Sequence, residues 1–238
     1  MLSNKMMQLF VLKFERRIFA KTFILRKGRF AVLFRDRMDA GEQLAEAIGL
    51  LDVKNVVILS LPRGGIPLGK IIAKKQGAPL DIILAKKIGH PTNPEYAIGA
   101  IAEGGTPILG DGYVEKIHEQ WVQKEIPFIR VEMARKRTLY RESLKDSTLK
   151  DKNVVIVDDG IATGLTMFAA IKAVKEAGPK SVSVAVPVIP KTIYEQLKQT
   201  VDKVYAVKAP DDFLGGVGAY YASFPQLKDE QVKEILKS

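Results

Sequence analysis

Five short runs of mainly aliphatic and β-branched residues recur along the chain, and polar or amphipathic stretches separate them. The runs cover 56–62, 80–89, 153–160, 181–190 and 201–210. Runs of this length, alternating with segments of helical periodicity, are typical of βαβ units with a parallel sheet. We therefore predict an α/β fold in which helices flank a parallel sheet and ligands bind at the carboxyl ends of the strands.

The segments between these runs predict helices and one irregular region. Residues 34–51 carry apolar residues at helical spacing, with Asp39 as the expected N-cap. Residues 90–113 are rich in Gly, Pro and Asn, which predicts a long loop or a small hairpin. Residues 113–144 predict one or two charged helices, and a final helix is expected from Asp229.

Composition narrows the chemistry that the chain can perform. The sequence has 238 residues, no cysteine and two histidines, His90 and His118. Disulfide scaffolds, cysteine-based zinc sites and thiol nucleophiles are therefore excluded, as is a metal site with three histidine ligands. Hydrophobic residues make up 47% and charged residues 27%, which indicates a globular chain with a real core and argues against a disordered protein.

Positive charge is concentrated at the N-terminus. The net charge is +10, of which residues 1–34 contribute +7. We therefore divide the chain into a basic N-terminal arm, 1–33, and a main domain, 34–238. Charged residues interrupt the apolar residues of the arm, so neither a membrane span nor a signal peptide is expected. We prefer two interpretations of the arm over a targeting segment: it packs on the body or on a partner subunit, or it is a disposable extension. Contact of the arm with nucleic acid or a membrane surface is less favoured.

The most informative motif is VVIVDDGIATGLT, residues 154–166, in which a buried strand ends in two aspartates and a loop of small residues leads into a helix. Gly160 and Gly164 allow backbone amides to approach an anion, and the following helix presents its positive N-terminus. Thr163 and Thr166 add hydroxyl donors. This combination predicts a phosphate-binding loop.

Asp158 and Asp159 lie beside this loop, where a bound phosphate would repel carboxylates. They instead suit the hydroxyl groups of a ligand, or a Mg²⁺ ion that the ligand carries. A phosphate next to a diol describes a sugar phosphate, which is the predicted ligand. The alternative is an Asp-Asp-Gly turn with a structural role. The prediction requires that both aspartates face a cavity and that unrelated ion pairs do not consume them.

Segment 154–166 resembles the phosphoribosyl diphosphate (PRPP) signature of the type I phosphoribosyltransferases. The resemblance implies that family's Rossmann-like fold with a small hood, and it implies that Asp158 and Asp159 hold the ribose hydroxyls and the cofactor Mg²⁺. The residues implied to bind the 5′-phosphate are Ala162, Thr163, Gly164, Leu165 and Thr166, and Gly160 is a further substrate-binding candidate. Gly160 stands where the family usually has an aliphatic residue, which we expect to loosen the loop without removing a ligand group.

Two further strand ends resemble motifs of the same family. The sequence LPRGG resembles the diphosphate loop, which implies that Arg63 neutralises the diphosphate while Gly64 and Gly65 let the backbone approach it. Such loops often contain a non-proline cis peptide, which we expect at Arg63–Gly64. Lys86 and Lys87 resemble a basic pair that reaches the diphosphate; we expect one of them to be functional and name Lys87 as the catalytic candidate. The alternative is an ordinary turn with an exposed arginine and two solvated lysines.

Residues 89–112 resemble the flexible catalytic loop that closes over the reacting centre in this family. A loop of this length inside a compact domain is often functional. His90 and Glu103 are its titratable residues, and either is a candidate for proton transfer. The alternative for each is an ordinary surface residue.

Residues 208–224 resemble the hood that covers the nucleobase, with Phe213 as the stacking residue and Leu214 as a backbone contact. The alternative is that the aromatic residues of this segment belong to the core. Hypoxanthine-type members carry one aspartate in the phosphate loop and another late in the hood, whereas this chain has Ala162 and Tyr220 at those positions. The acceptor therefore stays open at this point.

The resemblance implies a pentosyltransferase that moves a phosphoribosyl group from PRPP to a nitrogen acceptor, by preference a nucleobase, and releases diphosphate. The implied catalytic residues are Asp158, Asp159, Arg63 and Lys87, which act by positioning and charge stabilisation. A PRPP- or nucleotide-sensing regulator on the same fold is the alternative, and a sugar-phosphate hydrolase lacks an evident group to activate water. We expect a cytoplasmic protein that forms a homodimer.

Overall fold

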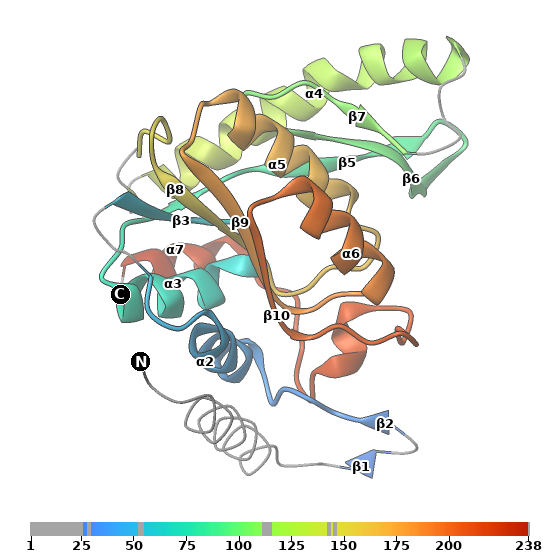
Figure 1. Ribbon diagram of the computed structural model, residues 1–238. Helices are drawn as coiled ribbons and strands as arrows, with labels where there is room; N and C mark the ends of the chain where they lie inside the picture. Colours follow the sequence, from blue (N-terminus) through green and yellow to red (C-terminus); the bar gives the residue numbers. More distant parts are fainter. Residues whose placement is uncertain are drawn as a thin grey trace.

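The computed structural model describes residues 26–27, 30–51, 55–110, 116–141, 144 and 147–237 (Figure 1). Most of the predicted arm, 1–33, lies outside these residues; within it, β1 (Arg26–Lys27) and β2 (Phe30–Ala31) pair antiparallel. Among the described helices, none is long and apolar enough to cross a membrane. Every residue predicted to bind substrate or metal lies in the described ranges.

The centre of the main domain is a five-stranded parallel sheet with the order β10–β9–β8–β3–β4. Its strands are β3 (Val56–Ser60), β4 (Leu80–Ile82), β8 (Asn153–Val157), β9 (Ser181–Val188) and β10 (Lys203–Lys208). The predicted α/β fold with a parallel sheet is thereby confirmed. Because β3 and β8 are neighbours and Ser60 pairs with Val157, the loops that follow these two strands start side by side.

The central strands are buried on both faces, which explains why the sequence shows continuous apolar runs rather than alternation. In β8, Val154 and Ile156 join one apolar cluster, whereas Val155 and Val157 join another on the opposite face. Successive side chains of a strand point to opposite faces, so one strand supplies both clusters. The sheet therefore requires a layer of helices on each side.

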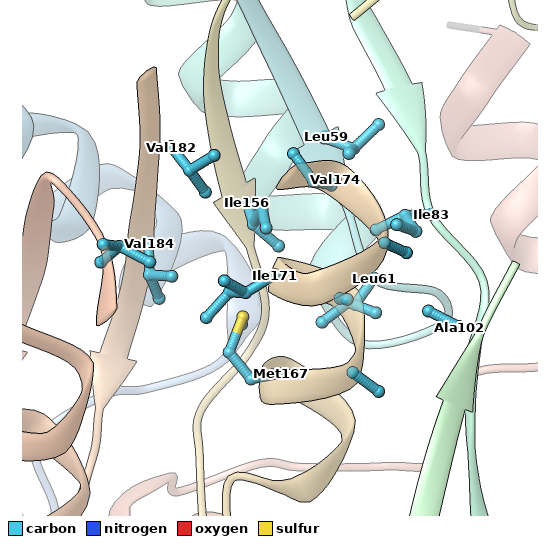
Figure 2. Close-up of a cluster of buried hydrophobic side chains, with 14 of the residues drawn as sticks. Leu59, Leu61, Ile83, Ala102, Ile156, Met167, Ile171, Val174, Val182 and Val184 are labelled. Carbon is cyan, nitrogen blue, oxygen red and sulfur yellow. The ribbon is translucent and has the colours of Figure 1, made fainter. Parts of the chain in front are cut away.

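Helices cover the two faces of the sheet as predicted. Their bounds are α2 (Arg37–Ile48), α3 (Gly65–Gln76), α5 (Leu165–Glu176) and α6 (Lys191–Thr200). Helices α5 and α6 pack on the first cluster and α2 and α3 on the second (Figure 1). Figure 2 shows Met167 and Ile171 of α5 against Ile156 of β8. The Asp36 side chain accepts a hydrogen bond from the Asp39 amide at 2.9 Å, so Asp36 is the N-cap of α2 and the predicted Asp39 cap is wrong.

A second, antiparallel sheet lies beside α5 and the long helix α4 (Lys116–Arg141) (Figure 1). Its strands are β5 (Ala85–His90), β6 (Asn93–Ala102) and β7 (Ile108–Leu109), in the order β5–β6–β7. The predicted single strand 80–89 is therefore wrong, because β4 ends at Ile82 and β5 belongs to the other sheet. Of the two alternatives for 90–113, the hairpin forms. Residues 116–141 form one charged helix, with Pro127 inside it.

The hood is attached to the chain segment that precedes α2. Segment 208–224 contains a short 3-10 helix, η2 (Val217–Tyr220), and the final helix α7 (Asp229–Lys237) begins as predicted. The amides of Leu33 and Phe34 donate to the Tyr220 carbonyl, both at 3.0 Å, and the Ala222 amide donates to the Phe34 carbonyl at 2.8 Å. These hydrogen bonds fix the hood to the body of the domain.

Candidate active site

The loops that follow β3 and β8 touch each other at the carboxyl edge of the sheet. A Cβ atom added at Gly64 would overlap the Asp159 carboxylate, and one added at Gly65 would collide with the backbone at the end of β8. Glycine is therefore required for this close approach, which brings the two motifs together at one edge of the sheet. The cis peptide lies at Pro62–Arg63, one bond before the predicted Arg63–Gly64, so that predicted position is wrong.

The two predicted aspartates are adjacent and largely withdrawn from solvent. Asp158 Oδ1 accepts a hydrogen bond from the Asp159 amide at 2.8 Å, and Asp159 Oδ2 accepts one from Arg37 Nε at 2.8 Å. Burial, reinforced by the neighbouring Asp159 charge, raises the pKa of Asp158 well above its ordinary value. Burial also raises the pKa of Asp159, although Arg37 opposes the increase. Each carboxyl group would therefore gain from a ligand cation or hydroxyl donor.

The ion pair between Arg37 and Asp159 was not predicted, and for Asp159 it runs against the requirement that no unrelated ion pair engages the two aspartates. The side chains are 11% and 14% exposed, so solvent screens the pair little. Arg37 Nη1 also donates to the Pro225 carbonyl at 2.7 Å, and its guanidinium lies 3.8 Å from the Phe224 ring centroid. The pair spans 122 residues of sequence, and no local motif around Arg37 indicates it. Among the described residues, Asp158 forms no ion pair.

The predicted phosphate loop presents open backbone donors. Among the described residues, none accepts a hydrogen bond from the amides of residues 162–166. Gly164 has φ +80 at the N-terminus of α5, a conformation that favours glycine, and no side chain caps the helix. Thr163 is exposed and Thr166 is half-buried. Free amides at the positive end of a helix provide the features of an anion-binding site.

Gly160 is packed tightly rather than loosely. Its φ is +151, and an added Cβ would lie 2.5 Å from Val217 Cγ1 of η2 and 3.1 Å from Val188 Cγ1. The hood therefore fills the space that an aliphatic side chain at residue 160 would occupy. We expected this glycine to loosen the loop; instead it lets the hood approach the loop directly.

The aromatic residues of the hood divide into core and half-buried positions. Tyr220 and Tyr221 are buried, and the Tyr221 hydroxyl donates to the Asp159 carbonyl at 2.7 Å. Phe213 is half-buried with its ring centroid 5.3 Å from that of Tyr220, and the Leu214 amide donates to the Tyr220 hydroxyl at 3.0 Å. The tyrosines thus follow the structural alternative, whereas base stacking by Phe213 stays a prediction.

The predicted basic residues are not equivalent in the structure. Arg63 Nη1 lies 3.7 Å from Asp229 Oδ1 of α7, and Lys86 forms an ion pair with Glu132 of α4. Lys87 is exposed and forms no ion pair within the described ranges. Lys86 lines a cavity together with Arg63, whereas Lys87 does not. Lys86 thus lies in a cavity beside the loop after β3, while the catalytic role of Lys87 stays a prediction.

Of the two titratable residues of the predicted catalytic loop, one ends a strand and the other, Glu103, lies in the turn after β6. His90 ends β5, and its Nδ1 lies 3.0 Å from the Thr92 hydroxyl. Glu103 binds Arg137 through both carboxylate oxygens, at 2.7 to 3.1 Å. Glu103 lines a 300 Å³ cavity with Ala177, at the far end of α5 from the phosphate loop. Because 12 helical residues span about 18 Å, Glu103 lies about one helix length from the phosphate loop, which argues against proton transfer by Glu103 there.

The carboxyl groups suit a metal ion that arrives with the ligand rather than a resident one. The described residues contain no group of three or more His, Asp or Glu side chains that could hold a metal. Mg²⁺ is commonly bound through one or two carboxylates together with substrate phosphates. Asp158 and Asp159 supply such a pair beside the anion-binding loop.

Comparisons with known proteins cover most of the main domain. The sequence profile described as the phosphoribosyl transferase domain matches residues 35–223, which include every predicted site residue. A Mycobacterium tuberculosis protein, provisionally named a phosphoribosyl transferase, is 38% identical over 210 residues, 86% of this chain and 46% of that protein. The chain thus spans about half the length of this relative. A crystal structure of the protein TT1426 from Thermus thermophilus is 40% identical, with a TM-score of 0.72, and the match covers 86% of this chain and 97% of that one.

Proposed function

Because the chain belongs to the phosphoribosyl transferase domain family, we propose that it transfers the 5-phosphoribosyl group of PRPP to a nitrogen acceptor and releases diphosphate. The observation that carries this proposal is the contact between the loops after β3 and β8. The open amides of residues 162–166 adjoin Asp158 and Asp159, and Gly64 touches Asp159. An anion-binding loop next to two carboxyl groups suits a phosphorylated sugar whose hydroxyls face the carboxylates.

In the proposed reaction, the bond between ribose C1 and a diphosphate oxygen breaks, and its electron pair leaves with the diphosphate. A bond forms between C1 and the acceptor nitrogen, whose proton is lost to water. Asp158 and Asp159 hold the ribose hydroxyls and place negative charge near the cation that develops on the sugar, while Arg63 and Lys86 neutralise the departing diphosphate. The chemistry that a bound Mg²⁺ supplies is charge neutralisation on that leaving group.

We propose a nucleobase as the acceptor, bound against the part of the hood that carries Phe213. The half-buried ring of Phe213 supports this assignment, since a partly open aromatic face suits stacking on a base. The hydrogen bond from the Leu214 amide to the Tyr220 hydroxyl holds this part of the hood in place. A screen of nucleobases with PRPP and Mg²⁺ for diphosphate release identifies the acceptor.

Ligand-dependent thermal stability tests the donor assignment without knowledge of the acceptor. PRPP with Mg²⁺ at about 100 times its Kd should raise the melting temperature by roughly 5–10 °C, because binding to the folded state alone stabilises it. The double variant Asp158→Asn, Asp159→Asn should fold and lose this increase. The matched control is Asp211→Asn, Asp212→Asn, an exposed Asp-Asp pair in the hood, which should keep it.

Two results would contradict the donor assignment. One is a wild-type melting temperature that PRPP and Mg²⁺ leave unchanged. The other is an increase that the Asp158, Asp159 double variant retains in full.

A further inference from the structure

A small cavity with three cationic side chains lies beside the loop after β3. Its volume is 110 Å³, and Arg63 of that loop, Lys86 of β5 and Lys136 of α4 line it together with Glu132 and Tyr140. A water molecule occupies about 30 Å³ of liquid, so the cavity has room for a group the size of a phosphate. The position of the cavity and its cationic lining suit an anion of about the size of a phosphate group.

Carboxylates hold all three cations of this cavity. Glu132 binds Lys86 through Oε2 and approaches Lys136 through Oε1 at 3.4 Å. The hydrogen bond from Lys86, followed by the charges of both lysines, lowers the pKa of Glu132, so this group is ionised at neutral pH. One carboxylate therefore serves two lysines.

The third cation is held from the C-terminal helix. Arg63 pairs with Asp229, and the fully buried Tyr140 donates its hydroxyl to the same Asp229 oxygen at 2.6 Å. With Glu132 and Asp229 counted against three cations, the group keeps one excess positive charge. The three cations and Glu132 are about one-third to one-half exposed, so a ligand can reach the cations and replace a carboxylate.

We propose that Lys136 is a further substrate-binding residue: it contacts the outer phosphate of the diphosphate in this cavity, and Glu132 holds it in place until phosphate displaces the carboxylate. The proposal rests on the proposed function, since PRPP supplies the diphosphate. A phosphate group carries about 1.5 to 2 negative charges and three acceptor oxygens, which exceeds the single charge of Glu132. Lys86 and Lys136 can therefore exchange one carboxylate for a stronger common partner.

Two substitutions with opposite expected effects test this exchange. Lys136→Gln removes a cation and should weaken the binding of inorganic diphosphate about tenfold, while the affinity for ribose 5-phosphate stays unchanged. Glu132→Gln removes the competing carboxylate and should tighten diphosphate binding severalfold. Lys136→Arg should restore affinity, and Lys172→Gln on the exposed face of α5 is the control of equal charge. Isothermal titration calorimetry in the presence of Mg²⁺ measures all the affinities.

The outcomes separate this proposal from the proposed function. If wild-type protein binds PRPP and the Lys136→Gln and Lys172→Gln variants bind diphosphate with equal affinity, the role of Lys136 is overturned and the proposed function stands. A loss of both ligands in Lys136→Gln, or weaker diphosphate binding in Glu132→Gln, shows that the pair is only structural and also overturns it. Wild-type protein that binds neither PRPP nor ribose 5-phosphate overturns the proposed function and this inference with it.

Discussion

Two neighbouring, half-buried carboxyl groups at the end of β8 lower the stability of the unliganded protein. Burial and the adjacent Asp159 charge raise the pKa of Asp158 in the folded state above its unfolded value. The folded state therefore binds this proton more tightly. The contribution of Asp158 to stability is therefore greatest below the pKa that this group has in the unfolded state. The contribution is lost as the pH rises through the pKa of Asp158 in the folded state. Bound substrate would offset this loss.

Asp158→Asn should stabilise the unliganded protein at neutral pH while abolishing PRPP binding. The amide needs no ionisation in a buried position, and its oxygen can still accept the Asp159 amide. The gain in free energy of unfolding should shrink as the pH falls toward about 4, where the wild-type carboxyl group is protonated. Urea denaturation in EDTA across this pH range measures the difference in free energy of unfolding, with Asp211→Asn as the control. A lower stability than wild type near pH 7 would contradict the argument.

Arg37 and Arg35 offer a matched pair of arginines on one segment. Arg37 is 11% exposed and binds Asp159 and the Pro225 carbonyl, whereas Arg35 is 71% exposed and pairs with Asp39 at the surface. Arg37→Gln should lower the free energy of unfolding by about 2–3 kcal/mol, because it leaves a buried carboxylate without its cation. Arg35→Gln should change it by less than about 0.5 kcal/mol. Equal effects in chemical denaturation would show that burial of the pair is unimportant.

The contact between the hood and the phosphate loop joins two elements that are distant in sequence. Gly160→Ala should destabilise the protein by about 1–3 kcal/mol, because the new methyl group meets Val217 and the backbone has a positive φ. Adding Val217→Ala should recover part of the loss in a double-mutant cycle. Gly216→Ala, where an added Cβ meets nothing within 4 Å, is the control. Strict additivity in thermal denaturation would disprove the contact.

Regular elements were predictable where the sequence pattern reports the local environment. The continuous apolar run at β8 indicates burial on both faces, and its Asp-Asp-Gly ending indicates the site. The boundary between β4 and β5 was missed because one apolar run, 80–89, crosses from one sheet into another, and apolarity does not identify the partner strand.

Features that depend on the meeting of distant segments were not predictable from local patterns. The ion pair between Arg37 and Asp159 is one such case, because its two members are far apart in sequence and neither flanking motif points to the other. Lys86 was not separable from Lys87 for the same reason: strand alternation shows that they face opposite ways, but only the position of α4 shows which one lines the cavity.

In the whole molecule, the first described residues of the main domain close the fold against its last third. Phe34 is fully buried, its ring lies 5.0 Å from that of Tyr221, and its carbonyl accepts the Ala222 amide. The Arg35 carbonyl accepts the Ser223 amide at 2.9 Å. Residues 33–35 therefore connect the hood to α2. The hood in turn contacts Asp159 of the candidate site.

Two truncations separate the basic arm from this connection. Removal of residues 1–31 keeps Leu33, Phe34 and their hydrogen bonds, so we expect the melting temperature and PRPP affinity to stay close to those of the full chain. Removal of residues 1–35 deletes a buried aromatic side chain, which typically costs about 3–5 kcal/mol, and frees the hood. Hydrogen exchange at the Ala222 and Ser223 amides should then accelerate, together with a loss of PRPP affinity. Retained protection after the longer truncation would show that other contacts hold the hood, whereas loss of PRPP binding after the shorter one would make the arm part of the site.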